Sequence, residues 1–503
     1  MSSKKQIKNV GVLFVGQILI KGSSFIKQLL LAFYLGVSGQ VDLLIVSQMI
    51  PSILSSMIAG GAGEILVTNQ KKGKRYDDNF VVLFIFSIAI LTIVTGIIYL
   101  LCLPLVCSLF KIHLAQKSLF WSISIIVILA RIPAAFVSSL QHLLFAKDKY
   151  KFFTISSLFA EISGILTIVL FYNSSGVLAF AYGLFVTPFV NALFFVYAHK
   201  LNVFVIFKKE VWKTQKDELI AILKKTFSLS LQTLVNQLST FWERTLSKRY
   251  LSEGFLSAMN YSKSLTELPK MALLSSILTT TYIEQVNKKT EDESEYLKYT
   301  NKMEKFLSEI SLIFQTLSIL FGPFILILFF KRGAFDELAV IRTFSIYQVL
   351  SIGFLPGLML NFMSRTMYIE SEYKKLFYII LVKFLLEIFI MVGFIGISSY
   401  AIPAALVLGK FFTSFAIFII LIRKHKEIFN IPAFIKINVL LIILSVTIGI
   451  ANNYIIDILL PKSVWEIIAI YSPLLILSAI AIFYYLNRNY GVEFKKYFLK
   501  KSV

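Results

Sequence analysis

A polar stripe with positive charge runs through the first long apolar segment of the chain. Lys21 lies about a dozen residues from either end of it, which at about 1.5 Å per helical residue is about 20 Å from water. A cation at that depth costs at least about 2.5–3.5 kcal/mol on insertion scales, so its usual role is to line a wet cavity or meet an anion. Gln17, Ser24 and Gln28 share its helical face, and Lys27 lies to one side. The stripe therefore predicts an anion-binding surface.

Long apolar segments recur along the chain and must position this stripe. Hydrophobic residues make up 57% of the sequence, charged residues only 16%, and the mean hydropathy is +0.78. This pattern is typical of an all-α polytopic membrane protein, and it lacks the ten-residue alternation of a β-barrel. We expect about 14 transmembrane helices, at 9–35, 42–68, 80–107, 118–146, 153–172, 177–198, 226–250, 255–285, 306–330, 337–368, 376–399, 401–422, 434–459 and 464–486.

Lysine and arginine gather in alternate connections between these segments. The basic stretches include 71–75, 199–225 and the tail after 487, and they fall on one side if each segment crosses once. The positive-inside rule then places both termini in the cytoplasm. The formal charge of +22 would suggest a nucleic-acid partner in a soluble protein, but here it is explained by topology and by contact with anionic membrane lipids. No cleavable signal peptide is expected, because the first apolar segment is long and has no small-residue cleavage site.

Residues suited to catalysis or metal binding are sparse. Cys102 and Cys107 lie in one apolar segment and at its end, and the four histidines are scattered. The sequence has no glycine-rich phosphate loop, no HExxH and no Gly-x-Ser-x-Gly elbow. We therefore predict a transporter, not an enzyme, with no metal and no cofactor.

A short internal repeat links the first and seventh segments. Residues 24–35 align without gaps with residues 240–251, and both segments begin on the cytoplasmic side. This predicts two pseudo-symmetric six-helix halves, at 1–200 and 226–424. A cytoplasmic amphipathic linker at 201–225 would join them, and 425–503 would add two further helices and a basic tail.

The seventh segment has a polar face as well. Glu243 lies on this polar face, and Arg244 lies about 100° round the helix from Glu243. Two polar helices facing each other predict a central hydrophilic cavity. Pro51 and Pro269, inside the second and eighth segments, mark kinks where a helix can bend or hinge.

Three motifs resemble one known family. They are Arg332-Gly333-Ala334-Phe335 with Thr343, Gly353, Pro356, Ser364-Arg365 and Tyr368; Trp242 to Leu246 with Glu253-Gly254, Ser257-Ala258, Asn260-Tyr261 and Leu268-Pro269; and Phe25-Ile26-Lys27 with Gly36, Asp42, Pro51 and Gly61-Ala62. In these the chain resembles the MurJ/MviN lipid II flippases, within the superfamily that also holds multidrug exporters and O-antigen flippases. The resemblance covers nearly the whole chain and implies the same transporter fold.

The resemblance also implies a substrate site. Lys21 and Lys27 fall where the family has arginines, Arg244 and Glu243 match its arginine and neighbouring acid in span seven, and Asp42 matches its acid at the head of span two. These cations are thought to engage the lipid-linked pyrophosphate and sugar.

The sequence departs from the family pattern at three places near this site. Ser55-Ser56 replaces an arginine pair, Gln28 stands for an acid beside Lys27, and Gly60 for an acid in the glycine-rich turn. Lysine in place of arginine keeps the charge but loses the two-pronged fork that suits phosphate. The pyrophosphate site is therefore altered.

The implied function is a flippase of a bacterial inner membrane, serving peptidoglycan synthesis and cell-wall biogenesis. It would move a polyprenyl-pyrophosphate-linked glycan, of the lipid II type, from the cytoplasmic to the outer leaflet by alternating access. Two alternatives stay open: an O-antigen or capsule-type oligosaccharide cargo, and a cation-coupled drug exporter, which would present acids to its cavity. The energy source, whether membrane potential, sodium or protons, also stays open, so a coupling ion is a further expected partner.

Overall fold

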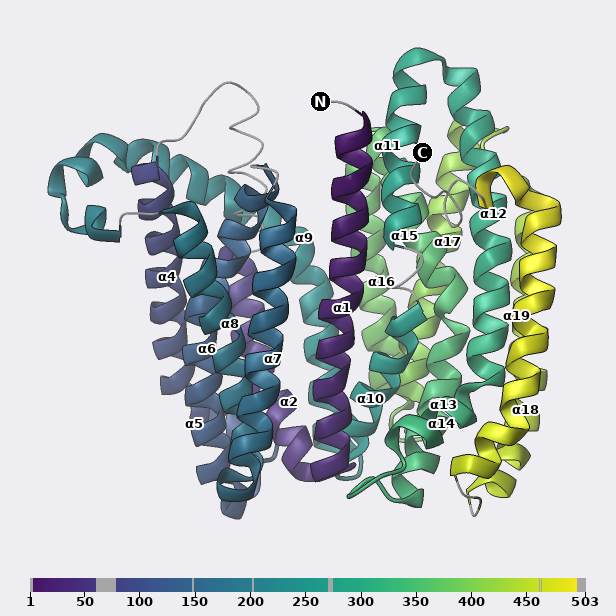
Figure 1. Cartoon of the computed structure of the whole chain (residues 1–503), viewed down its shortest axis with the longest axis horizontal. Helices are drawn as coiled ribbons and strands as arrows, with labels where there is room; N and C mark the ends of the chain where they lie inside the picture. The colour runs from purple at the N-terminus through teal and green to yellow at the C-terminus, as the bar shows by residue number, and fades with distance from the viewer. Residues whose placement is uncertain are drawn as a thin grey trace. The chain divides into compact units, whose positions relative to one another are not determined.

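A computed structural model describes residues 3–59, 78–146, 149–200, 203–269, 275–460, 462 and 464–494. Every regular element in these ranges is a helix, which confirms the all-α fold (Figure 1). Part of the second expected segment, 42–68, and the basic stretch 71–75 lie outside the described residues.

The helices follow the expected segments closely. They are α1 Ser3–Leu35, α2 Gly39–Ala59, α4 Asp78–Leu101, α5 Leu103–Leu109, α6 Leu114–Ala146, α7 Tyr150–Ser175, α8 Leu178–His199, the 3-10 helix η1 Val203–Phe207, α9 Lys209–Tyr250, α10 Phe255–Pro269, α11 Ser275–Glu291, α12 Glu293–Leu320, α13 Gly322–Phe330, α14 Glu337–Ile352, α15 Phe354–Ile369, α16 Tyr373–Phe394, α17 Ala401–Lys424, α18 Ile431–Leu459 and α19 Val464–Phe494.

Nine helices of the described chain are long and apolar enough to cross a membrane, or up to eleven if two bent pairs each count as one span. The bent pairs are α12 with α13, at 57°, and α14 with α15, at 42°. Pro323 in the first turn of α13 and Gly353 between α14 and α15 accompany these breaks. Expected spans 226–250, 255–285 and 464–486 fall on α9, on α10 and α11, and on α19. Those helices are too polar, or their apolar stretches are too short, to be counted among the membrane-crossing helices. A count of fourteen therefore stays a prediction.

The chain forms two compact units. The first comprises Met1–Leu31 and Ser38–Leu256, and the second comprises Ala32–Val37 and Ser257–Val503. Helix α9 packs along α2 within the first unit. The expected division of the chain at 201–225 stays a prediction. The pseudo-symmetry of the two expected halves stays a prediction.

The expected amphipathic linker forms the start of α9. From Lys209 to Tyr250 the sequence has no glycine or proline, so nothing interrupts the helix for 42 residues. Leu219 and Ile222 are buried in a cluster with Phe84, and the Trp212 ring meets Phe86 edge to face. The apolar face of this segment is therefore covered by α4, whereas a free surface helix would have placed it in lipid.

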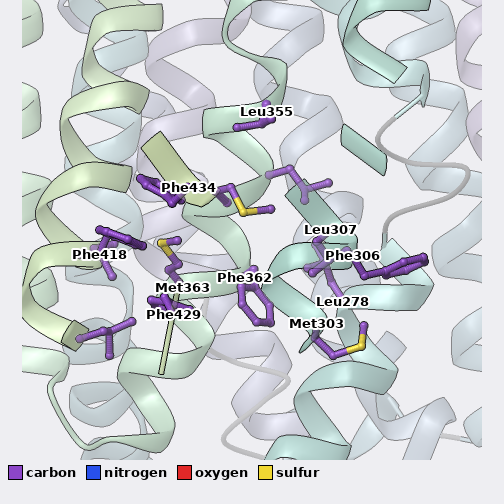
Figure 2. Packing of buried hydrophobic residues seen from close by; sticks show 14 of the residues in the cluster. Leu278, Met303, Phe306, Leu307, Leu355, Phe362, Met363, Phe418, Phe429 and Phe434 are labelled. Atoms are coloured by element: carbon purple, nitrogen blue, oxygen red, sulfur yellow. The ribbon is translucent and has the colours of Figure 1, made fainter. Parts of the chain in front are cut away.

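The second unit has its own aromatic core. Phe362 lies near the centre of Figure 2 and Phe306 lies to its right, and the labelled side chains come from α11, α12, α15, α17, α18 and the turn before α18. Phe418 stacks on Phe434 with ring centroids 3.8 Å apart. The core residues shown are almost fully buried, so the helices of this unit are held by dense apolar packing.

Candidate functional site

Lys27 is held by two partners inside the first unit. Its Nζ atom lies 2.6 Å from Oε2 of Glu161 on α7, and it donates a hydrogen bond of 2.7 Å to Oγ1 of Thr187 on α8. The Thr187 hydroxyl donates to the Gly183 carbonyl at 2.9 Å, so its lone pairs remain for the lysine. A methyl group at Gly164 would lie 2.8 Å from Nζ, so the glycine leaves room for the ammonium group.

A polar cavity of about 250 Å³ lies beside this ion pair. Its lining comes from α1, α6, α7 and α8: Gln17, Ile20, Lys21, Gln141, Phe153, Ser157, Glu161, Thr187 and Asn191. Lys21 is exposed, and it forms no ion pair with a described residue. The cavity therefore combines one unpaired ammonium group with amide and hydroxyl groups, a composition that suits a polar, anionic ligand.

Only part of the polar stripe predicted from the sequence lines this cavity. Gln17 and Lys21 line it as expected, whereas Ser24 and Gln28 do not belong to the lining and are partly buried along α1. Glu161 was not predicted as a site residue. The same signal that singled out Lys21, a charged residue inside an apolar segment, is present at Glu161 in segment 153–172.

A second charged group involves α9. Glu243 is only 2% exposed, and Arg244 follows it in the sequence. Arg131 lies on α6, and its guanidinium donates to Oγ of Ser52 at 2.5 Å and to the Gln48 carbonyl oxygen at 3.4 Å, both on α2. Arg131 was not among the expected site residues, although it too lies within an apolar segment, 118–146.

Asp42 is buried at the start of α2. Its Oδ2 atom accepts the Gly254 N–H at 2.9 Å and lies 3.7 Å from Nζ of Lys248. Gly254 has φ +85°, a conformation that glycine adopts without strain. These contacts join α2 to the end of α9 and the turn before α10. A role for Asp42 in substrate binding stays a prediction.

The two expected hinge prolines differ in setting. Pro51 lies inside α2, which continues as a helix to Ala59. Pro269 is the last residue of α10, and 270–274 lie outside the described residues. Their role as hinges stays a prediction.

An ionic cluster joins helix ends in the second unit. The Glu370 carboxylate, almost fully buried, lies 3.1 Å from Nζ of Lys289, 3.0 Å from Nζ of Lys424 and 3.0 Å from Nε2 of His425. Burial raises the pKa of Glu370, but hydrogen bonds from Lys424, His425 and Lys289 outweigh it and lower the pKa from 4.5 to about 2. The carboxylate is therefore ionised throughout the physiological range.

Apolar helices around a charged internal cavity define a polytopic membrane transporter. The family model described as "Lipid II flippase MurJ" matches residues 31–472. The chain belongs to this family, which confirms the resemblance found in the sequence. It is therefore a multi-pass protein of a bacterial inner membrane.

Individual relatives agree with this assignment. The chain is 25% identical over 427 residues to the "Probable lipid II flippase MurJ" of Buchnera aphidicola subsp. Baizongia pistaciae, covering 78% of this chain and 79% of the relative. A solved structure titled "Lipid II flippase MurJ, inward closed conformation" superposes with a TM-score of 0.69 at 16% identity, covering 93% of this chain and 100% of that one. An outward-facing multidrug transporter of the MATE family has the same general fold, with a TM-score of 0.59 at 16% identity and coverage of 85% and 97%.

Proposed function

We propose that the protein moves a polyprenyl-pyrophosphate-linked glycan of the lipid II class from the cytoplasmic to the outer leaflet. The observation that carries this proposal is the exposed ammonium group of Lys21 in a cavity of about 250 Å³, within a chain of the lipid II flippase family. Both termini lie in the cytoplasm in this proposal, and the basic connections meet anionic lipids there.

The cavity offers the groups that such a head group requires. Lys21 supplies a positive charge for a phosphate, and the side-chain amides of Gln17, Gln141 and Asn191 can donate to and accept from sugar hydroxyls. The polyprenyl tail stays in lipid, because only the head group is too polar to cross the bilayer unaided. Lys27 joins in binding when the phosphate competes with Glu161 for its ammonium group.

Transport follows from alternating access. The loaded cavity closes to the cytoplasm and opens to the outer side as the halves of the transporter rock, with Pro51 and Pro269 as candidate bending points. Glu243, Arg244, Asp42 and Gln28 complete the proposed set of substrate-contacting residues. A coupling ion or the membrane potential supplies the direction.

A second candidate is a cation-coupled drug exporter. The fold shared with a multidrug transporter and the Glu161 carboxylate at the cavity favour it. However, Glu161 pairs with Lys27 at 2.6 Å, so its negative charge is balanced and a cationic drug would have to break an ion pair. A glycan cargo other than lipid II fits the same groups, and lysines in place of arginines make the phosphate contact less specific.

Rescue of bacteria depleted of their lipid II flippase tests the proposal. We expect the wild-type gene to restore growth and rod or coccal shape, and the K21A and R244A variants to fail at equal protein levels. The K208Q variant, which changes an exposed lysine before α9, serves as a matched control and should rescue fully. A different cargo would give a different result. If neither the wild-type gene nor the K208Q variant rescues the depleted strain, but the wild-type gene rescues a mutant that lacks its O-antigen flippase, the cargo is another lipid-linked glycan.

A further inference from the structure

Glu304 is a buried carboxyl group on α12, in the second unit of the chain. Its side chain is 2% exposed, and it forms no ion pair with a described residue. Met303 and Leu307, its neighbours along α12, are almost fully buried in the apolar core shown in Figure 2. An ionised carboxylate taken out of water without a counter-charge is costly, and such a group takes up a proton instead. The surroundings of Glu304 therefore favour a bound proton.

Ser308 lies between Glu304 and a second helix. Its Oγ atom is 2.8 Å from Oε1 of Glu304 and 3.2 Å from Sδ of Met359 on α15. A hydroxyl group has one hydrogen to donate and lone pairs with which to accept. When Glu304 is protonated, its O–H donates to Ser308 and Ser308 donates to the Met359 sulfur, so both contacts are satisfied at once. When Glu304 is ionised, the carboxylate takes the Ser308 hydrogen and the contact with α15 is lost.

Ionisable residues on the helices packed against α12 leave Glu304 without a counter-charge. These residues are Tyr282, Glu284, Lys288, Lys289 and Glu291 on α11, Glu337, Arg342 and Tyr347 on α14, Arg365 and Tyr368 on α15, and Lys436, Tyr454 and Asp457 on α18, while α13 has none. Within the described ranges none of them forms an ion pair or a hydrogen bond with Glu304. Glu309, the next acid along α12, accepts a hydrogen bond of 2.8 Å from the Tyr485 hydroxyl. A proton is therefore the positive charge that Glu304 can obtain in this packing.

A row of buried hydroxyl groups leads from Glu304 toward the charged end of α12. Thr300 and Tyr296 lie one and two turns before Glu304, on the same helical face, and both are fully buried. Steps of four residues separate these side chains by about 6 Å along the helix. The Tyr296 ring lies 4.9 Å from Nζ of Lys289, whose side chain is 27% exposed. The row therefore joins the buried carboxyl group to a part of the second unit that water reaches.

We propose that Glu304 binds the proton whose uptake and release drive the transport cycle. Resting on the proposed function, this makes the proton the coupling ion, held in the second unit on a residue outside the proposed glycan-binding set. Proton uptake joins α12 to α15 through Ser308 and Met359, and proton release opens that contact so that water reaches the carboxylate. Both helices belong to bent pairs, and the break beside each leaves room for this change. Glu304 is thus the proton-binding residue, and Ser308 is a positioning residue.

Infrared spectra of the full-length protein in nanodiscs test proton binding. At pH 7 the wild type should show the carbonyl band of a protonated carboxylic acid that E304Q lacks. The control E295Q, which changes an exposed acid of the same helix, should keep this band. S308A should shift the band, because the carboxyl O–H loses its acceptor, and S308T should restore its position.

Flipping of labelled lipid II in proteoliposomes tests the coupling. A gradient of about one pH unit, with the membrane potential clamped, should shift the distribution of the lipid between the leaflets by up to about tenfold for wild type and E295Q. E304Q keeps the shape of a protonated glutamate but carries no exchangeable acid. It should therefore give the same distribution with and without the gradient, and S308A should give a smaller shift than S308T.

Each contrary result has a distinct meaning. A carboxylic acid band that is the same in wild type and E304Q overturns the proton site. Lipid II flipping that responds to the pH gradient equally in wild type and E304Q, or in neither, overturns the coupling while the proposed function stands. No flipping by wild type overturns the proposed function and the coupling, and the infrared band then tests proton binding alone. If E304Q does not fold, the band position and the gradient response of S308A and S308T decide the outcome.

Discussion

Lys27 of α1 and Glu161 of α7 form an ion pair whose Nζ and Oε2 atoms lie 2.6 Å apart. The side chains are 17% and 15% exposed, so little water screens the pair. The pair gives a lysine inside an apolar helix a carboxylate partner, and it also withholds that lysine from any other anion. A phosphate that binds Lys27 must displace Glu161. The ion pair is therefore both a structural contact and a competitor of the substrate.

Substituting Glu161 should separate these two effects. We expect E161Q to lower the thermal stability, because it leaves the Lys27 charge without its partner. The loss of stability should be smaller than that from breaking a fully buried ion pair, which is typically about 3–5 kcal/mol. The same variant should bind undecaprenyl pyrophosphate more tightly, since Lys27 is released. The double variant K27Q/E161Q should recover stability but not affinity, which a double-mutant cycle would measure. Weaker lipid binding by E161Q would contradict the competition.

Gly164 should be sensitive to a single added methyl group. The new Cβ in G164A would lie 2.8 Å from Nζ of Lys27 and also meet the Thr187 hydroxyl. We expect the Lys27–Thr187 hydrogen bond to be displaced and transport to fall, with normal amounts of protein in the membrane. G393A in α16 is the matched control, because nothing lies within 4 Å of that Cβ. That control should be neutral or gain about 0.5–1 kcal/mol from helix propensity. Equal transport by both variants would argue against a functional role for the contact.

The Glu370 cluster predicts a defined response to acid. The pKa of Glu370 is about 2 in the folded protein and 4.5 ordinarily, so the unfolded state binds the proton more readily. The stabilisation is fully present above pH 4.5 and is lost as the pH falls from there to about 2. Thermal unfolding of wild type and E370Q should therefore differ at pH 7 and converge toward pH 2. A difference that stays constant over this range would show that Glu370 does not act through its charge.

Single helices could be predicted from the sequence, whereas their pairing could not. Apolar length and loop charge were sufficient for the boundaries of α6, α7 and α8, and a charge inside an apolar segment singled out Lys21 and Lys27. The partner of Lys27 comes from a helix more than a hundred residues away, and no periodicity within one segment encodes such a contact.

The seventh segment shows the same limit. Its polar pattern predicted a helix with a polar face, but the sequence did not predict that α9 packs along α2 in the first unit. Helical periodicity fixes which residues share a face, but tertiary packing decides which neighbour that face meets. The partner of Arg131 could not be predicted for the same reason, because Ser52 comes from another helix.

The most direct test of the central claim is flipping of fluorescent lipid II by purified protein in proteoliposomes. Wild type, K21Q, K21R and the control K208Q would be compared by the rate at which labelled head groups become accessible to a quencher on the opposite side. We predict rapid exposure for wild type and K208Q, a partial rate for K21R, and a rate near that of empty liposomes for K21Q. Equal rates for K21Q and wild type would contradict the claim that the Lys21 cavity carries the lipid-linked glycan across the membrane.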